Sequence, residues 1–407
     1  MSALIVRGGA TLSGEITVGG SKNAALPIIF ATLITNGVSH ISGVPNILDV
    51  AVAIGIIKEF GAVVERWGSE LFVDTTDLSY STPSNASVSK IRASSYLLGA
   101  LASRFGRARV MSFGGCNFEN RPIDMHISAL TKLGATVSGN EIYAPKLVGS
   151  DIRFEKISVG ATVNAILMSA TAKGTTRIYG YAKEPHVLAL IDYLISCGAS
   201  ISLSPDCITV IGCELHGGTA RIIPDMIEAG TYLMISAMTG SGISVRGMDL
   251  SELEAFLPGI CASGIGFCEK GGSVFPFGEI NSSFDIVTGP HPAFPTDMQP
   301  QCAPLMSVAG GSIKDTVWCG RFGYLEELAK FGLRYTRVKN SAEIFPSKLS
   351  AAQVFATDLR GGAASLIAAL ACPGESVIKN AEIIDRGYED IVNKLCSLGA
   401  KIKRKEI

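Results

Sequence analysis

Amphipathic helical patterns recur along the chain, and each of them ends at a glycine. In the last one, GYEDIVNKLCSLGAKI, the apolar residues Ile391, Leu395 and Leu398 fall on one face of a helix, and Gly399 follows. Glycine readily adopts the left-handed conformation with which many helices end, so Gly399 is predicted to be the residue that terminates this one. A strand is predicted directly after it. The segment therefore predicts a compact unit of helix, glycine and strand.

The same pattern occurs six times at an almost constant spacing. Its phrases are FGAVV, LGATV, CGASI, SGIGF, FGLRY and LGAKI, and the glycines in them are Gly61, Gly134, Gly198, Gly264, Gly332 and Gly399. Neighbouring glycines are 64 to 73 residues apart, and six units of about 68 residues account for all 407 residues. The sequence therefore predicts a protein built from six related α/β units.

Each unit also contains a second helix that is apolar nearly all round. The six segments are KNAALPIIFATLITNG, RASSYLLGALASRFG, SVGATVNAILMSATAKG, MIEAGTYLMISAMTG, QCAPLMSVAGG and RGGAASLIAALACPG. Helices of this kind are predicted to be buried. The residues predicted to cap them are Ser21, Ser89, Ser158, Asp225 and Asp358. In the fifth unit Pro300 and Pro304 are predicted to delay the helix, which leaves Asp297 in the loop before it.

Basic residues stand at equivalent positions in these units. Three begin apolar helices and three precede the other helices: Lys22, Arg92, Arg360, Arg121, Arg321 and Arg386. Helix N-termini carry partial positive charge and free N–H groups, which favour anions. Taken singly, each of these residues is more often an ordinary helix-start residue or a solvated surface side chain. Six of them in matching positions instead predict a shared site for an anion.

Composition narrows the class of protein. The chain has 47% hydrophobic and 17% charged residues and a net charge of −1, which fits a folded protein of two or three domains and speaks against a nucleic-acid binder. The ten cysteines are scattered, with no C-x-x-C pair and no Cys/His metal spacing. The start MSALIVRGGA is no secretory signal, and no apolar stretch is long enough for a membrane span. We therefore expect a cytoplasmic protein with reduced thiols and without a metal or organic cofactor.

The combined motifs resemble the enolpyruvyl transferases over essentially the whole chain. The motifs are SKNAALP, IRAS, GGC followed by RP-x-D-x-H, SVGAT, PD-x-IEAGTY, HPAFPTDMQ, TV followed by RF, ATDLR and IDRGYE. The resemblance implies a two-domain inside-out α/β barrel, with the helices of each domain clustered inside and its sheets outside. It assigns residues 21–225, with a catalytic lid loop at 112–121, to one domain, and residues 1–20 and 226–407 to the other. The active site is expected in a cleft between them that closes on substrate.

The resemblance also implies a reaction. The enolpyruvyl group of phosphoenolpyruvate moves to the 3′-hydroxyl of UDP-N-acetylglucosamine and phosphate leaves, by addition and then elimination, as the first committed step of peptidoglycan synthesis. Arginine suits the donor because its planar fork meets a carboxylate or phosphate at two points. By resemblance, Lys22, Arg121 and Arg386 bind the phosphate, and the charge that develops there makes Lys22 and Arg386 catalytic. Arg321 and Arg360 bind the carboxylate.

Two residues are expected to move protons. Asp297 in FPTDMQ is the carboxylate that would deprotonate the sugar hydroxyl, and its alternative role is a helix cap or an Asx turn. Cys116 in the lid would protonate C3 of the enol, since a thiol with a pKa of ~8.5 is mostly protonated at neutral pH. Any one of ten cysteines is by itself more often a buried thiol, so the assignment of Cys116 depends on its motif. In the family this cysteine is the target of the epoxide fosfomycin.

The resemblance assigns the nucleotide sugar to a wider set of residues. Asn23 and Asp297 contact the sugar. The residues expected on the uridine diphosphate side are Arg121, Pro122, Ile123, Asp124, His126, Lys156, Ser158, Val159, Gly160 and Val317, with Arg92 in support. SVGAT is a predicted helix N-terminus, which suits a diphosphate. His126 taken alone would more often be a structural histidine.

The lid departs from the family pattern. It reads C-N-F-E-N-R-P, whereas members have a glycine at the position of Glu119 and an aliphatic residue at that of Phe118. The mobility and the local charge of the lid are therefore open. The segment after Arg360, Gly361–Gly362, is also looser than usual.

Other functions remain open beside this one. A paralogue that uses another nucleotide or UDP-sugar would keep the arginines and Cys116 but alter the sugar side, and Asn23 and SVGAT look unaltered. The 5-enolpyruvylshikimate-3-phosphate synthase branch is disfavoured, since it lacks the lid cysteine and carries Lys-Ser where this chain has Lys22-Asn23. A non-catalytic UDP-sugar-binding paralogue is supported only by the unusual lid. The expected partners are small molecules, not nucleic acid or membrane, and the oligomeric state is open.

Overall fold

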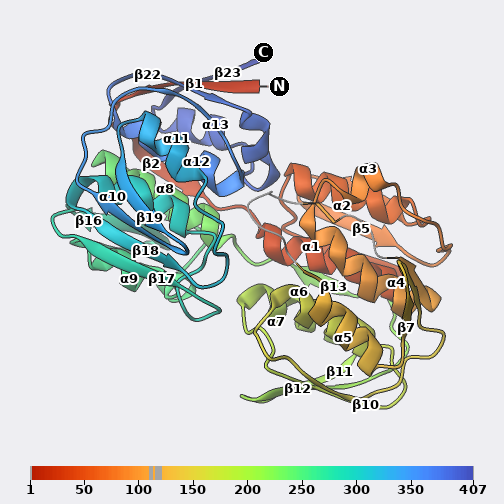
Figure 1. The fold of residues 1–407 in the computed structure, drawn as a ribbon. Coiled ribbons are helices and arrows are strands. Elements are labelled where there is room, and N and C mark those ends of the chain that lie inside the picture. The colour runs from red at the N-terminus through yellow and green to blue at the C-terminus, as the bar shows by residue number, and fades with distance from the viewer. Residues whose placement is uncertain (1, 110–112, 115–121, 407) are drawn as a thin grey trace. The chain divides into compact units, whose positions relative to one another are not determined.

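The computed structural model describes residues 2–109, 113–114 and 122–406. The chain forms two compact units. The first unit holds the chain up to Gly19 and again from Pro224 onward, and the second holds the described residues from Gly20 to Ile223 (Figure 1). The chain therefore starts in the first unit, builds the second and returns to the first.

The six predicted repeats are present, and their glycines end helices. All six glycines have a left-handed backbone, with φ between 95° and 103°. The helices that precede them are α2 (Leu48–Lys58), α5 (Asp124–Lys132), α7 (Pro185–Ser196), α9 (Leu257–Cys261), α11 (Tyr324–Lys330) and α13 (Ile391–Ser397). The strands that follow are β4 (Val63–Trp67), β7 (Thr136–Ser138), β11 (Ser200–Leu203), β15 (Ile265–Lys270), β19 (Arg334–Val338) and β23 (Lys401–Glu406). The glycine period thus marks one helix–strand unit per repeat.

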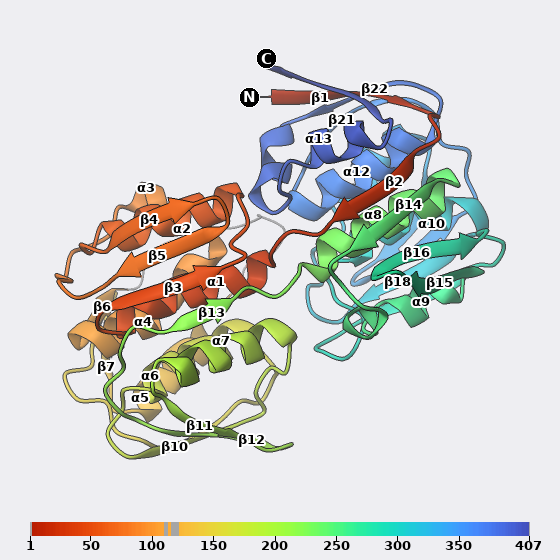
Figure 2. The same ribbon diagram turned by 180° about the vertical axis from the view of Figure 1, so that it is seen from behind.

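The first unit is organised around three buried helices. These are α8 (Met226–Thr239), α10 (Gln299–Ala309) and α12 (Leu359–Ala371), and they pack on one another. Sheets lie outside them, as Figure 2 shows for the sheet that contains β14 (Gly242–Arg246). The strand orders are β21 (Gln353–Phe355), β22 (Gly374–Lys379), β1 (Ser2–Gly8) and β23; β15, β16 (Ser273–Gly278), β14 (Gly242–Arg246) and β2 (Ser13–Thr17); and β17 (Phe284–Thr288), β18 (Gly311–Asp315), β20 (Ser341–Phe345) and β19. Helices inside and sheets outside are the predicted inside-out arrangement.

The second unit repeats this plan. Its apolar helices are α1 (Lys22–Ala31), α4 (Leu97–Phe105) and α6 (Val159–Ser169), with α4 packed against the other two. Its strand orders are β13 (Thr219–Arg221), β3 (Val38–Ser42), β5 (Glu70–Asp74) and β4; β11, β12 (Cys207–Ile211), β10 (Thr175–Tyr179) and β9 (Asp151–Arg153); and β6 (Arg107–Arg109), β8 (Glu141–Tyr143) and β7. Each four-stranded sheet of either unit has one parallel pair at an edge and is otherwise antiparallel. The remaining short helices of the described residues are α3 (Asn85–Val88), η1 (Thr32–Ile34), η2 (Arg92–Tyr96), η3 (Leu250–Leu253) and η4 (Ala381–Arg386).

Each unit has its own hydrophobic core, formed by its inner helices and the inner faces of its sheets. Helix α12 has thirteen residues, and the twelve from Leu359 to Leu370 are all buried. This confirms that the apolar helices are buried all round. Within the described part of the chain, no helix is both long and apolar enough to span a membrane.

The predicted helix caps are confirmed at three positions and wrong at one. The side chains of Ser158, Asp225 and Asp358 accept hydrogen bonds from the first turns of α6, α8 and α12. Ser21 occupies the N-cap position of α1 without a side-chain bond. Ser89 is no N-cap, because it ends the short helix α3, and the chain then enters α4 through the 3₁₀ turn η2.

The loop before α10 contains Asp297, as predicted, but only one proline acts at the helix start. The helix begins at Gln299, with Pro300 in its first turn, where a missing N–H costs nothing. Pro304 lies inside the helix and does not delay it. Asp297 therefore stands two residues before a buried helix.

Candidate active site

The carboxylate of Asp297 lies between two arginines of the first unit. Arg321 Nη1 donates to Oδ1 at 2.7 Å, and Arg360 donates to Oδ2 through Nη2 at 3.1 Å and Nε at 3.3 Å. The arginine side chains are 6% and 1% exposed, whereas that of Asp297 is 27% exposed. The structure thus brings together three predicted residues from three segments of the sequence. We call Asp297, Arg321 and Arg360 the Asp297 cluster.

The charges of this cluster stabilise one another. Burial alone lowers the pKa of Arg321, but the carboxylates of Asp297 and Asp358 outweigh it and leave that pKa above its ordinary value. The pKa of Arg360 is also raised, because the Tyr388 hydroxyl and Asp297 outweigh the effect of burial. Both guanidinium groups therefore stay charged, and the cluster offers two fixed cations to an anionic ligand.

A buried carboxylate behind the cluster orders its loop. Asp315, at the end of β18, accepts from Val317 N at 2.8 Å through Oδ1 and from Thr296 Oγ1 at 2.7 Å through Oδ2. Thr296 in turn accepts from Arg321 Nη1 at 3.2 Å. Because Thr296 precedes Asp297 in the chain, one carboxylate fixes both the loop of the cluster and the predicted residue Val317.

Arg360 is the more deeply enclosed of the two arginines. It is the second residue of α12, and the N-cap Asp358 accepts from its backbone N at 3.0 Å. Its guanidinium carbon lies 5.3 Å from the centre of the Tyr388 ring. The Nη1 atom is buried and has no hydrogen-bond partner within the described residues. An unpaired buried donor is costly, so this N–H suits a ligand that brings a carboxylate or phosphate oxygen.

Arg386, predicted to bind phosphate, is the last residue of η4 and is half-buried. The turn η4 packs on α12, the helix that carries Arg360. Arg386 therefore belongs to the same part of the first unit as the Asp297 cluster.

Lys22 and Asn23 begin α1 in the second unit. Lys22 Nζ lies 3.7 Å from Asp49 Oδ2, and the two side chains are 14% and 4% exposed. Asp49 is in the first turn of α2, which packs on α1. This ion pair holds a cation at the start of a buried helix, as the sequence predicts.

A neutral group of polar side chains is buried in the same unit. His126 in α5 is 4% exposed, and its Nδ1 lies 2.7 Å from Asn164 Nδ2 on α6. Asn164 Oδ1 accepts from Gly99 N at 2.6 Å. Burial lowers the pKa of His126 to about 4, the positive charge of Arg92 adds to this effect, and Asp124 opposes it. The ring is therefore neutral at physiological pH. We call His126, Asn164 and Gly99 the His126 cluster.

The other nucleotide-side residues lie at the starts of α5 and α6 or just before them. They are Pro122, Ile123, Asp124, Lys156, Ser158, Val159 and Gly160, and only Ile123, Ser158, Val159 and Gly160 are partly buried, the others being exposed. A Cβ placed on Gly160 would lie 2.9 Å from His126 Cε1, so only glycine lets the start of α6 approach the ring this closely. Arg92 begins η2, and burial lowers its pKa. The structure thus joins the start of α6 to His126.

The remaining predicted residues, Cys116 and Arg121, lie outside the described residues. Among the residues that are described, no group of three His, Cys, Asp or Glu could hold a metal ion.

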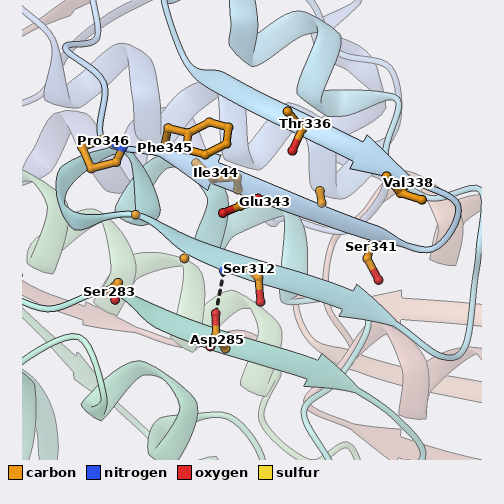
Figure 3. Close-up of a pocket in the computed structure, with 13 residues that line it drawn as sticks. Ser283, Asp285, Ser312, Thr336, Val338, Ser341, Glu343, Ile344, Phe345 and Pro346 are labelled. Carbon is orange, nitrogen blue, oxygen red and sulfur yellow. Dashed lines mark hydrogen bonds between the residues drawn. The ribbon is translucent and has the colours of Figure 1, made fainter.

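A hollow of about 610 Å³ lies on the face of the sheet formed by β17, β18, β20 and β19 (Figure 3). Its walls include Ser312, Thr336 and Glu343, and Asp285 Oδ1 accepts from Ser312 N at 2.9 Å. None of the predicted site residues lines it. It contains no basic side chain, so it is a poor site for the anion that the sequence predicts.

Comparison with known proteins decides the family. The family model for EPSP synthase (3-phosphoshikimate 1-carboxyvinyltransferase) matches residues 6–395. The chain belongs to the enolpyruvyl transferase family. A UDP-N-acetylglucosamine 1-carboxyvinyltransferase of Halothermothrix orenii is 38% identical to it over 413 residues, which cover 99% of this chain and 100% of that protein. One of Clostridium botulinum is 39% identical over 417 residues, with 99% and 100% covered.

Solved structures agree with this assignment. The enolpyruvyl transferase NikO from Streptomyces tendae is 25% identical to this enolpyruvyl transferase, with a TM-score of 0.89 and 99% of each chain covered. An EPSP synthase from Acinetobacter baumannii is 15% identical, with a TM-score of 0.73 and full coverage of both chains, and shows the common fold alone. Members of this transferase family act on small-molecule substrates.

Some residues in or beside these clusters are absent from the sequence-based set. Asn164, Asp315 and Tyr388 support predicted residues through contacts between segments far apart in the chain. Asn164 offered one signal, because it is the polar side chain in the middle of the apolar run VGATVNAILMS. Asp315 offered none, since a lone Asp after a short strand reads as an ordinary turn residue.

Proposed function

We propose that this enolpyruvyl transferase moves the enolpyruvyl group of phosphoenolpyruvate to the 3′-hydroxyl of UDP-N-acetylglucosamine and releases phosphate. The full-length relatives named UDP-N-acetylglucosamine 1-carboxyvinyltransferase support this choice of acceptor. The reaction would take place in the cytoplasm as the first committed step of peptidoglycan synthesis.

The Asp297 cluster is the observation that carries this proposal. In it the carboxylate of Asp297 occupies the forks of Arg321 and Arg360, which we propose as the binding groups for the carboxylate of phosphoenolpyruvate. A substrate carboxylate that takes this place releases Asp297 from Arg321 and Arg360. The freed carboxylate can then accept the proton of the sugar hydroxyl. Substrate binding and activation of the base become one event.

The phosphate of the donor is assigned to Lys22, Arg121 and Arg386. Lys22 is held at 3.7 Å by Asp49, which is long for an ion pair, and a phosphate offers a larger charge at shorter range. Charge accumulates on the leaving phosphate during elimination, so these cations stabilise the transition state as well as the bound substrate.

Protons and bonds balance over the two steps. In the addition, the sugar oxygen bonds to C2 of the enol, Asp297 takes the hydroxyl proton, and the Cys116 thiol gives its proton to C3. In the elimination, C3 returns a proton to the Cys116 thiolate, the C2–O bond to phosphate breaks, and Asp297 passes its proton to the departing phosphate. Full turnover by a Cys116→Ser variant would remove Cys116 from this scheme.

The nucleotide sugar is assigned to the starts of α5 and α6. Asn23 and Asp297 contact the sugar in this proposal. Val317 and Arg92 join the residues of the uridine diphosphate side, which are Arg121, Pro122, Ile123, Asp124, His126, Lys156, Ser158, Val159 and Gly160. The start of α6 supports a diphosphate site, because its free N–H groups and its dipole favour negative charge.

One assay tests the function. The protein is mixed with phosphoenolpyruvate and UDP-N-acetylglucosamine, and phosphate release is followed. Release that requires both substrates is the expected result. Tight UDP-sugar binding without release would support a non-catalytic paralogue, and release with UMP but not with the sugar would support an enzyme for another nucleotide.

A further inference from the structure

Asn164 is a buried amide that links three helices. It lies on α6, its Oδ1 accepts from Gly99 N on α4 at 2.6 Å, and its Nδ2 donates to Ser95 O on η2 at 3.1 Å. Ser95 and Gly99 are four residues apart, so in a regular α-helix Gly99 N would donate to Ser95 O. Here the amide of Asn164 contacts both of these backbone groups. Both Asn164 and Ser95 are buried. The amide has two more contacts through Nδ2, with His126 Nδ1 at 2.7 Å and with Gly160 O at 3.4 Å.

These contacts fix which end of the amide is nitrogen. A backbone N–H can only donate, so the atom that faces Gly99 N must be the amide oxygen. A backbone carbonyl can only accept, so the atom that faces Ser95 O must be the amide nitrogen. The opposite orientation would set donor against donor and acceptor against acceptor at two buried places.

The orientation of the amide fixes the histidine in turn. Since Asn164 Nδ2 is a donor, His126 Nδ1 must accept and carries no proton. A neutral imidazole with a bare Nδ1 has its proton on Nε2. The edge of the ring that holds Nε2 faces Gly160, where a Cβ would lie 3.1 Å from that nitrogen. Nε2 has no hydrogen-bond partner among the residues that the structure describes, and it lies beside the first turn of α6.

We propose that Asn164 is a positioning residue that holds His126 as the tautomer with its proton on Nε2, so that the ring presents a fixed hydrogen-bond donor to the diphosphate of the nucleotide sugar. The identity of this ligand rests on the proposed function, whereas the tautomer does not. The donor adds direction to the free N–H groups at the start of α6. It brings no charge, so it stays the same when the pH changes around neutrality.

The surroundings of the ring agree with a neutral donor. The charges that act on it are Arg92 from η2, which disfavours a second proton, and Asp124 from α5, which favours one. The third helix against the ring, α6 (Val159–Ser169), has no charged residue. Burial and Arg92 prevail over Asp124, so the ring keeps one proton from physiological pH down to weakly acidic pH.

Nitrogen-15 NMR of the imidazole rings tests the tautomer directly in the full chain. The protein has five histidines, and loss of one ring signal in a His126→Gln variant identifies the signal of His126. We expect Nδ1 of the wild type to be unprotonated and Nε2 to be protonated from about pH 5.5 to about pH 8. A proton on Nδ1 of His126 in the wild type would overturn the proposal, whatever the Asn164 variants do.

An Asn164→Asp variant tests the positioning. A carboxylate can still accept from Gly99 N but cannot donate to Nδ1, so Nδ1 should gain a proton and the pKa of the ring should rise. At about pH 8 the neutral ring would then point a bare Nε2 at the diphosphate, and at about pH 5.5 the imidazolium would donate again. As the pH rises from about 5.5 to about 8, we expect the affinity of this variant for UDP-N-acetylglucosamine to fall about tenfold or more. The affinity of the wild type should change about twofold or less over the same range.

Two further results separate this inference from the proposed function. Adding His126→Gln to Asn164→Asp should abolish the pH dependence, since no ring remains to change its tautomer. A wild type with the expected tautomer that does not bind UDP-N-acetylglucosamine would contradict the proposed function and leave the tautomer in place. A wild type that binds it, together with an Asn164→Asp variant in which Nδ1 stays unprotonated, would contradict the positioning role alone.

Discussion

The Asp297 cluster and the His126 cluster bury polar side chains in different ways. In the first unit, two arginines that are almost completely buried share one carboxylate that is itself partly exposed. In the second unit, a buried imidazole is kept uncharged and is tied by an amide to backbone groups. A charged pair can exchange its anion for another, whereas a hydrogen-bonded amide cannot change partners without leaving groups unpaired. The first arrangement suits substrate exchange and the second suits a fixed orientation.

The two clusters also differ in the free-energy cost of burying their side chains. Desolvating an arginine costs several kcal/mol, and the loss of a counter-ion leaves part of that cost uncompensated. In the Asp297 cluster an incoming substrate carboxylate supplies the counter-charge that Asp297 gives up. In the His126 cluster no charge is buried, and burial itself keeps the ring neutral. Substitutions in the two clusters should therefore affect different properties of the protein, and by different amounts.

The largest expected effect comes from Asp297→Asn. The amide cannot take the proton of the sugar hydroxyl, so phosphate release should slow by about 10²- to 10⁴-fold. It also competes less for Arg321 and Arg360, so the affinity for phosphoenolpyruvate should stay the same or rise. Initial rates of phosphate release and calorimetric titration with phosphoenolpyruvate measure the two effects. A loss of rate with an equal loss of affinity would show that Asp297 only holds the arginines in place.

Asp285→Asn is the matched control for this variant. Asp285 is an exposed carboxylate of the same unit, and it accepts from the backbone N–H of Ser312 on β18. The control should keep both the rate and the affinity of the wild type. A slow control would mean that the loss in Asp297→Asn reflects general damage to the unit.

A smaller effect is expected from Arg360→Lys. Lysine keeps the positive charge but loses the fork that contacts Asp297 through Nε and Nη2. The phosphoenolpyruvate concentration for half-maximal rate should rise about 10- to 100-fold. Arg337→Lys, an exposed arginine of the same unit, is the control and should leave that concentration unchanged. Equal behaviour of the two variants would show that charge alone, without the fork, serves the Asp297 cluster.

The sequence was sufficient for features that depend on local patterns. The six glycines, the apolar helices and the caps Ser158, Asp225 and Asp358 follow from residues within one turn of one another. Ser89 was assigned wrongly because a serine before an apolar run reads as an N-cap, and only the structure shows the 3₁₀ turn between them. Pro304 was assigned wrongly because α10 carries a proline within its interior.

In the candidate site, too, some features could be predicted from local sequence patterns and others could not. Asp297, Arg321 and Arg360 could be predicted because each stands at the start of a helix or in a family motif. Their ion pairs could not be predicted, since they join segments up to 63 residues apart. The same holds for Asn164 and His126, which are 38 residues apart. Sequence patterns identify charged candidates well, but the neutral group that orients another residue is visible only in three dimensions.

The smallest expected effect concerns stability, and it tests whether the His126 cluster is as free of charge as the comparison requires. The pKa of His126 is about 4 in the folded protein and ~6.5 in the unfolded chain, so only the unfolded chain binds a proton between these values. Stability is therefore lost as the pH falls below ~6.5, by up to about 1.4 kcal/mol per pH unit. Between about pH 6.5 and about pH 5 the loss should be about 1.5 kcal/mol, or roughly 4 °C in the unfolding temperature of a unit of this size.

His126→Gln should remove this part of the acid sensitivity, whereas His216→Gln, at an exposed histidine of the same unit, should leave it. Calorimetric scans at these two pH values measure the difference, and equal acid sensitivity of the wild type and His126→Gln would mean that His126 takes up a proton in the folded state and belongs with the charged cluster.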